Sequence, residues 1–151
     1  MSWPAVELDP VARLRALAAA LPHVAFEERV IEAPFARVWS FIEDMERGVP
    51  QFEGNVREIQ VLRREGERLW LRSRSPLGLT LRMQAVLRPG WCVMGTAKGG
   101  AQIGMAARAE GGRTRFAHFE GSRWLGRTAR PLFRAFVRRD LAQLARLAES
   151  V

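Results

Sequence analysis

The sequence predicts an α+β fold in which one curved antiparallel sheet of about seven strands wraps around a long C-terminal helix. Six strand-like segments follow one another with tight turns between them, a pattern typical of an antiparallel meander. The last stretch, 125–151, places apolar residues on one broad helical face and arginines on the other. We therefore expect the sheet to curl around this helix and bury its apolar face.

Composition and charge narrow the classes of function. The chain has 151 residues, 48% of them hydrophobic, enough for one domain with a sizeable core. Cys92 is the single cysteine, which excludes an internal disulfide and a cysteine metal cluster and fits a cytoplasmic location. The net charge of +8 is spread along the chain, so we interpret it as a solvated surface without specific nucleic-acid binding.

The N-terminal region 1–22 is predicted to be a helical extension of a domain that spans 23–151. Asp9 and Pro10 form a good helix start, and Leu21-Pro22 ends the helix that begins at Val11. We expect this helix to pack on the domain surface; a lid or a dimer contact is the alternative. No apolar run is long enough to span a bilayer, and the first ten residues make a poor signal peptide.

Strand and helix signals then follow in order. Residues 23–33 predict a first strand, Pro34 opens a helix, and 45–52 predict a second short helix interrupted by Gly48 and Pro50. The run of six strands is predicted at 56–64, 68–75, 79–88, 91–98, 101–109 and 113–122.

Asp140 breaks the pattern of the last helix. Its carboxylate projects into the apolar arc, which comprises Leu125, Ala129, Leu132, Phe133, Phe136, Val137, Leu144, Leu147 and Ala148. A buried carboxylate needs a partner, a proton or a wet cavity. Either Asp140 pairs with an arginine, for which Arg72, Arg74 and Arg82 are candidates, or it faces a ligand.

The sequence resembles the START/polyketide-cyclase-like (SRPBCC) superfamily, which has the helix-grip fold. The resemblance covers about Val24 to Glu149. It rests on Ile31-Glu32-Ala33-Pro34 followed by Val38-Trp39 and Ile42-Glu43-Asp44, and on Gln51-Phe52 with the following Val56. These motifs are specific for the fold rather than for a function.

The resemblance implies a cavity between the sheet and the last helix that binds a hydrophobic small molecule, such as a lipid, a quinone or a polyketide-like compound. No cofactor is implied, and the protein is expected to be a monomer or a homodimer. The candidate ligand-binding residues are Trp70, Leu81, Met83, Met94, Ile103, Met105, Phe116, His118, Leu132, Phe133, Phe136 and Asp140. The alternative for the apolar members is plain core.

The last strand carries the candidate chemistry. Thr114, Phe116, His118 and Glu120 share one face, and Arg115, Ala117 and Phe119 share the other. If His118 and Glu120 point inward, they form a possible acid–base cluster with Asp140, as a cyclase or aromatase would need. If Phe119 points inward, both face water. The pattern alone leaves the two orientations open.

Other chemistry finds little support. One histidine and two carboxylates are too few for a metal site, and His23 is expected to be exposed, so no metal is predicted. Cys92 lies in a strand, where a lone cysteine is usually inert. Arginines on the outer face of the last helix allow peripheral contact with an anionic surface, but such a face is more often simply solvated. The preferred function is therefore a binder or carrier; the alternative is a metal-free enzyme.

Overall fold

The structure is a computed structural model that describes residues 9–150. Met1 to Leu8 of the predicted extension and Val151 of the predicted last helix lie outside the described residues. The elements in chain order are α1 (Pro10–Ala19), β1 (Val24–Ile31), α2 (Phe35–Glu43), α3 (Val49–Phe52), β2 (Glu58–Glu65), β3 (Arg68–Arg74), β4 (Thr80–Arg88), β5 (Trp91–Gly95), β6 (Gln102–Glu110), β7 (Arg113–Gly121), the 3-10 turn η1 (Arg127–Ala129) and α4 (Arg130–Glu149).

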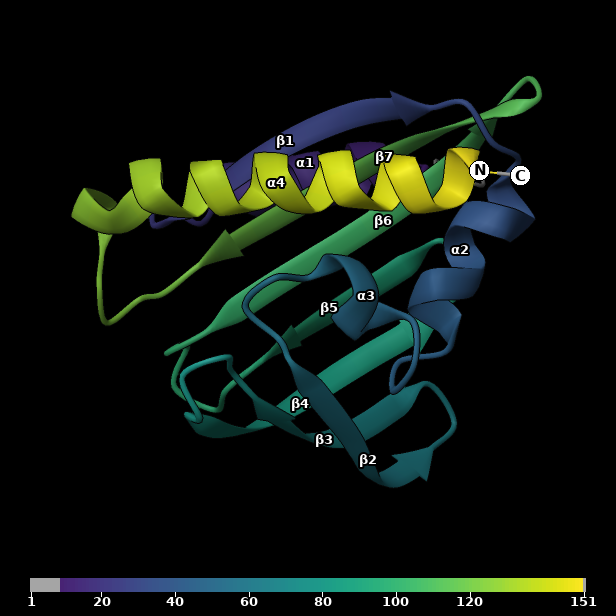
Figure 1. Cartoon of the computed structure of the whole chain (residues 1–151). Coiled ribbons are helices and arrows are strands. Elements are labelled where there is room, and N and C mark those ends of the chain that lie inside the picture. The colour runs from purple at the N-terminus through teal and green to yellow at the C-terminus, as the bar shows by residue number, and fades with distance from the viewer. Residues whose placement is uncertain (1–8, 151) are drawn as a thin grey trace, which may run out of the picture.

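The seven strands form one sheet in the order β1-β7-β6-β5-β4-β3-β2 (Figure 1). Each neighbouring pair is antiparallel, and consecutive strands from β2 to β7 pair with each other. The predicted meander of six strands is therefore confirmed. The first strand joins the far edge beside β7, where Phe26 lies opposite Phe119.

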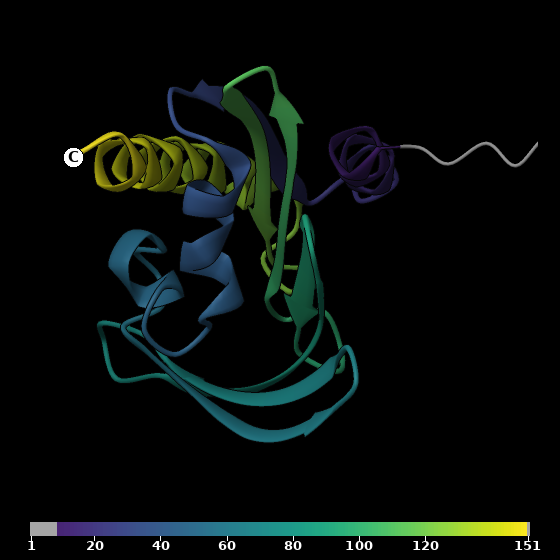
Figure 2. The ribbon, with the colours of Figure 1, turned by 90° about the vertical axis from the view of Figure 1, so that its right-hand side faces the viewer.

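The sheet bends strongly and separates the helices into two layers (Figure 2). Helices α2, α3 and α4 lie on the concave side, over the main hydrophobic core. Helix α1 lies on the convex side, where Val11, Leu14 and Ala18 pack in a second cluster with Ala117 and Phe119. The fold class predicted from the sequence is confirmed, because the long helix sits in the concavity of a curved seven-stranded sheet.

Helix α1 begins where its sequence predicts. The Asp9 side chain accepts a hydrogen bond of 2.9 Å from the Ala12 N–H, and Pro10 occupies the first turn. Val11 and Leu14 are completely buried against the sheet. The helix therefore packs on the domain surface, as expected.

Helix α4 starts five residues later than predicted, at Arg130 instead of Leu125. Gly126 adopts φ 68°, and the chain makes the turn η1 before the helix begins. Leu125 and Leu132 are thus 58% and 54% exposed instead of buried. The predicted phase holds farther along, where Val137, Asp140, Leu144 and Ala148 are buried.

Two further boundaries differ from expectation by three residues or more. The short helix predicted over 45–52 covers only Val49–Phe52, and the strand predicted over 91–98 ends at Gly95. Among the described residues, no helix combines the length and apolar character that a bilayer-spanning segment requires.

Candidate functional site

Strand β7 is buried on both faces, which decides the orientation that its sequence left open. Phe116, His118 and Glu120 point to the concave side, and Ala117 and Phe119 pack beneath α1. His118 and Glu120 are 0% and 2% exposed. The interpretation in which they face water is therefore wrong.

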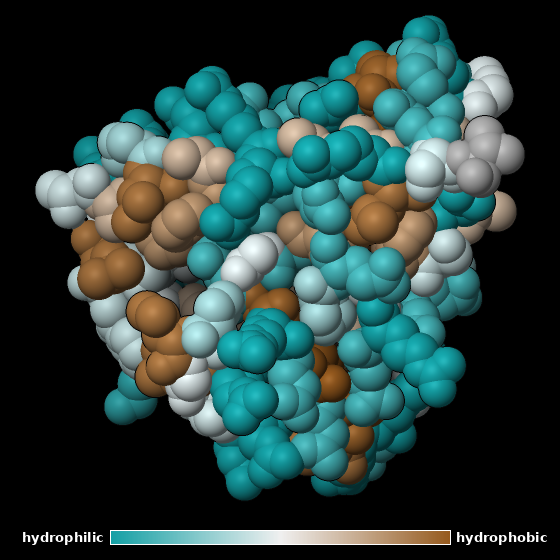
Figure 3. All heavy atoms as spheres, viewed as in Figure 1, coloured by the Kyte–Doolittle hydropathy of each residue, from teal (hydrophilic) through white to brown (hydrophobic). Residues whose placement is uncertain are grey.

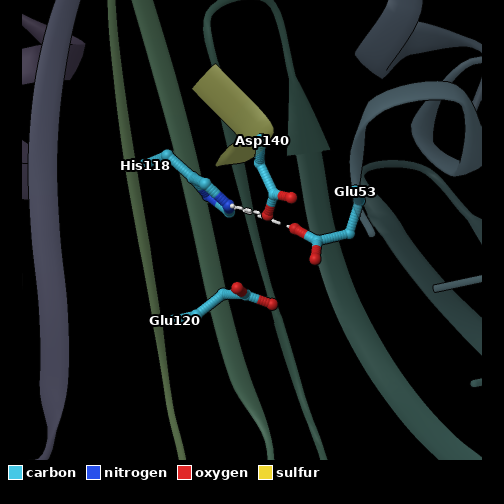
Figure 4. Close-up of side chains that lie close together, drawn as sticks. All are labelled: Glu53, His118, Glu120 and Asp140. Atoms are coloured by element: carbon cyan, nitrogen blue, oxygen red, sulfur yellow. Dashed lines mark hydrogen bonds and ion pairs between the residues drawn. The ribbon is translucent and has the colours of Figure 1, made fainter. Parts of the chain in front are cut away.

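Four ionisable side chains from three parts of the fold meet inside the concavity (Figure 4). His118 and Glu120 come from β7, Asp140 comes from α4, and Glu53 immediately follows α3. Glu53 and Asp140 are both completely buried. The structure thus brings the three predicted candidates together and adds Glu53, which sequence reasoning missed.

The His118 ring is held from two sides. Its Nδ1 donates to the Gly104 carbonyl oxygen at 2.9 Å, so this nitrogen carries a proton. Its Nε2 lies 3.1 Å from Asp140 Oδ2 and 3.1 Å from Glu53 Oε2. Only the Asp140 contact has hydrogen-bond geometry. The ring is therefore fixed with Nε2 directed at carboxylates.

Residues of the short segment Glu53–Asn55 form hydrogen bonds with three carboxyl groups of the cluster. The Gly54 N–H donates to Asp140 Oδ1 at 3.1 Å, and the Asn55 N–H donates to Glu53 Oε1 at 3.4 Å. The Asn55 side-chain amide donates to Glu120 Oε1 at 3.3 Å. A turn predicted only as a connection therefore orients three of the four members of the cluster.

Burial shapes the proton affinities of the cluster. The pKa of Glu53 is raised well above its ordinary value by burial and by the neighbouring Asp140 charge. The pKa of Glu120 is also raised well above its ordinary value, by burial and by Glu53. Burial opposes charge on His118, but the hydrogen bond to Asp140 and the Glu120 charge outweigh it and raise the pKa. The site thus holds protons that exposed carboxyl groups would release.

A pocket of about 550 Å³ opens beside this cluster, between the concave face of the sheet and the beginning of α4. Among the predicted ligand-binding residues, it is lined by Leu81, Met83, Ile103, Phe133 and Phe136. Glu120 and Asn55 also line it, whereas His118 and Asp140 lie behind them. The pocket therefore combines apolar walls with a polar inner end.

Five of the predicted ligand-binding residues lie elsewhere. Met94, Met105 and Phe116 are buried in the main core rather than along this pocket. Trp70 lies on the convex face of β3, under the Arg63 guanidinium at 4.9 Å, because Leu69 and Leu71 occupy the inner face. Leu132 is exposed at the start of α4.

The remaining candidates fill structural roles. Cys92 is buried, and burial raises the pKa of its thiol to about 12, so it is a poor nucleophile. His23 is buried and bonded to the Gln102 side chain, contrary to the expectation that it is exposed.

The four side chains of the cluster offer ligand atoms of the kind that bind metal ions. One ligand atom from each of Glu53, His118, Glu120 and Asp140 can be chosen so that all lie within 4.8 Å of one another. The sequence-based expectation of no metal depends on a set of one histidine and two carboxylates. Glu53 adds the fourth donor that the sequence did not reveal, because its position after α3 carries no pattern of burial.

Comparison with known proteins identifies the fold and leaves the function open. No family model matches the chain, and no curated protein matches it in sequence. Among solved structures, a protein of Thermus thermophilus is 20% identical with a TM-score of 0.64, covering 83% of this chain and 96% of its own.

Two further structures illustrate the same similarity. A Deinococcus radiodurans protein is 18% identical with a TM-score of 0.59, over 82% of this chain and 95% of that one. The Zhui aromatase/cyclase of Streptomyces sp. R1128 is 13% identical with a TM-score of 0.56, over 83% and 90%. With the curved seven-stranded sheet and its long C-terminal helix, these matches show that the chain has the helix-grip fold.

Proposed function

We propose that the protein binds or carries a hydrophobic small molecule, such as a lipid, a quinone or a polyketide-like compound, between the sheet and α4. The observation that carries this proposal is the apolar pocket of about 550 Å³, which lies within the range of volumes typical of ligand sites. The single buried free cysteine agrees with a cytoplasmic location.

The pocket favours an elongated ligand with one polar group. The Phe133 and Phe136 rings pack edge to face with centroids 6.0 Å apart and form one wall. Leu81, Met83 and Ile103 form the facing wall on the sheet. Asn55 and Glu120 at the inner end offer hydrogen-bonding groups to a hydroxyl or carbonyl oxygen.

Exposed apolar residues surround the pocket mouth and suggest how a ligand enters. Leu77 and Leu79 line the pocket and are 97% and 61% exposed. Trp124 is 67% exposed, and its ring lies directly over Gly100, another lining residue. Figure 3 shows apolar residues gathered on the side where α4 begins. We propose that this mouth, with the neighbouring Arg123, touches an anionic membrane surface from which the ligand is taken.

Filling the pocket tests the binding proposal. Leu81→Trp places a large ring on the pocket side of β4, and we expect it to weaken binding of fluorescent fatty acids and quinone analogues about tenfold or more. Val86→Trp is the matched control, because Val86 lies on the opposite face of the same strand. Met105, another residue predicted to bind the ligand, is unsuitable for a pocket-filling substitution because it is completely buried in the core.

Titrations of both variants, with circular dichroism to check folding, measure the effect. Native mass spectrometry of the wild-type protein gives the class of any ligand that co-purifies. If the wild type binds no member of a broad lipid, quinone and polyketide panel, or if Leu81→Trp binds as well as Val86→Trp, the binding proposal fails.

A cyclase or aromatase-like activity is the second candidate, favoured by the contact of Glu120 with both the pocket and the cluster. In this proposal Glu120 exchanges a proton with the bound ligand, while the His118–Asp140 pair behind it holds the compensating charge. Incubation with a linear poly-β-ketone analogue, followed by chromatography, tests it. Glu120→Gln should abolish product formation while analogue binding persists; product formation by the variant would reject a catalytic role for Glu120.

A further inference from the structure

We propose that Glu53, His118, Glu120 and Asp140 form a binding site for one divalent transition-metal ion of the Zn²⁺, Mn²⁺ or Fe²⁺ class. The donors are His118 Nε2 and one oxygen from each carboxylate, and one such set lies within 4.8 Å. This proposal replaces the sequence-based expectation that the chain has no metal site, and it is independent of the hydrophobic ligand.

The buried carboxyl groups of the cluster need either bound protons, as the pKa values of Glu53 and Glu120 raised by burial indicate, or a cation that displaces those protons. Three carboxyl groups and one imidazole are at most 2% exposed. Among residues 9–150, the guanidinium closest in an ion pair is that of Arg139, which approaches Asp140 Oδ1 at 3.6 Å and is 51% exposed. Carboxylates removed from water need a compensating charge or a full set of hydrogen bonds. A divalent ion supplies this compensation at a single point.

The Glu53 carboxyl group gives a second observation, separate from the clustering of the side chains, that points to a bound ion. Its Oε2 is completely buried, and within the part of the chain that the structure describes it receives no hydrogen bond. This oxygen points into the cluster and lies 3.1 Å from His118 Nε2 (Figure 4). An unpaired buried carboxylate oxygen costs about 1–3 kcal/mol or more, which a metal–oxygen bond removes.

The spacing of the donors fits coordination of one ion. Ligand atoms at about 2.0–2.1 Å from a metal lie roughly 2.8–3.0 Å from their neighbours in octahedral geometry and roughly 3.3–3.4 Å in tetrahedral geometry. His118 Nε2 lies 3.1 Å from both Glu53 Oε2 and Asp140 Oδ2. The whole set lies within 4.8 Å, so the widest pair must close by about an ångström for all four donors to surround one ion.

The outer hydrogen bonds already have the arrangement that metal ligands require. The bond from His118 Nδ1 to the Gly104 carbonyl fixes the tautomer that leaves Nε2 available. Gly54 and Asn55 orient the carboxyl groups of Asp140, Glu53 and Glu120 through hydrogen bonds. One imidazole with three carboxylates suits Zn²⁺, Mn²⁺ or Fe²⁺ better than Mg²⁺, which prefers oxygen ligands and water. Because Glu120 lines the pocket, the ion would be reachable from there.

The test uses the full chain after chelator treatment. Isothermal titration with Zn²⁺, Mn²⁺ and anaerobic Fe²⁺ should show one site per chain for at least one ion, with weaker binding of Mg²⁺ and a rise in melting temperature on loading. The isosteric variant Glu53→Gln should weaken binding about tenfold or more. Glu58→Gln, an exposed carboxylate on β2, and His23→Gln, the other histidine, should leave it unchanged.

A spectroscopic measurement on the wild-type protein tests the metal site even if the variants fail to fold. Co²⁺ added to the wild-type protein should give visible d–d bands of a nitrogen- and oxygen-ligated ion, and Zn²⁺ should remove them by competition. No binding of Zn²⁺, Mn²⁺ or Fe²⁺ at millimolar concentration overturns the proposal, as does full binding by Glu53→Gln or loss of binding in His23→Gln. Fatty-acid binding by the chelator-treated protein is measured alongside, so failure of the metal site is distinguishable from failure of the pocket.

Discussion

Asp140 shows how a single residue links the last helix to the rest of the site. Its sequence position predicted either an arginine partner or a ligand-facing role. In the structure His118 Nε2 and the Gly54 N–H contact its two oxygens, and the half-exposed Arg139 guanidinium approaches Oδ1 at 3.6 Å. The strand arginines Arg72, Arg74 and Arg82 are exposed and form no ion pair with it. Asp140 is therefore a fixed internal member of the cluster, one layer behind the pocket.

We expect Asp140→Asn to reduce the free energy of unfolding by about 1–3 kcal/mol, because the amide no longer matches both donors of a completely buried group. Asp44→Asn is the control, since Asp44 is exposed and caps the following turn, a role that asparagine performs equally well. Urea denaturation of both variants measures the difference. An Asp140→Asn protein as stable as the control would show that the contact with His118 contributes nothing to folding.

Helix α4 has two halves with different roles. The first half places Phe133 and Phe136 along the pocket, where both are only partly buried. The second half places Leu144, Ala145 and Ala148 in the closed core. The apolar arc looks continuous in the sequence, but its two pocket-lining phenylalanines are less closely packed than the residues of its second half.

Truncation of one side chain from each half should separate these roles. Leu144→Ala should cost about 2–5 kcal/mol, as is typical of a fully packed leucine. Truncation of a fully packed phenylalanine typically lowers the free energy of unfolding by about 3–5 kcal/mol. Phe133→Ala should lower it clearly less, and it should weaken binding of hydrophobic probes. Chemical denaturation and probe titration measure both effects. Equal losses of stability would mean that the pocket wall is packed as tightly as the core.

Helix α1 closes the convex face over β6 and β7, so its contribution is testable by deletion. We expect a chain that begins at His23 to keep its circular dichroism spectrum, as the predicted domain over 23–151 requires. It should be less stable than the full chain and self-associate, because Ala106, Ala117 and Phe119 lose their cover. Sedimentation and thermal unfolding measure this. Complete loss of folding would make α1 part of the domain rather than an extension.

On the scale of the whole molecule, arginines are spread along the chain, whereas exposed apolar residues gather on the side where α4 begins. Elsewhere, arginines on the outer face of α4 are engaged locally, since Arg134 and Arg138 both approach Glu27. The basic face that would allow peripheral contact with an anionic surface is thus partly neutralised. The pocket mouth is therefore the surface that we propose for membrane contact.

The double substitution Leu77→Ser and Trp124→Ser should reduce binding to anionic phospholipid vesicles at low salt several-fold, because it removes the apolar part of the contact. Leu62→Ser is the control, an exposed leucine on β2 away from the pocket lining. Vesicle sedimentation over a range of salt concentrations measures this, since the charge contribution is screened as salt rises. Negligible vesicle binding by the wild type would identify the basic surface as simply solvated.

Local patterns in the sequence were sufficient for the elements and the fold class. Proline and glycine turns separate the strands, alternation identifies the inner face of β4, and helical periodicity places Asp140 among buried residues. These signals depend only on neighbours in the chain. They predicted the curved sheet and the long helix. They also gave three of the four members of the cluster as candidates, but they left open whether His118 and Glu120 point inward.

The tertiary structure decided the rest, because it depends on contacts between distant segments. Both faces of β7 are buried although one of them carries polar residues, so only the placement of α1 on one side and α4 on the other directs His118 and Glu120 inward. Glu53 joins the cluster because the loop after α3 meets α4, where Gly54 and Asp140 are 86 positions apart in the chain. Sequence periodicity determined which residues share a face, whereas long-range packing alone determined which faces meet and where the pocket remains open.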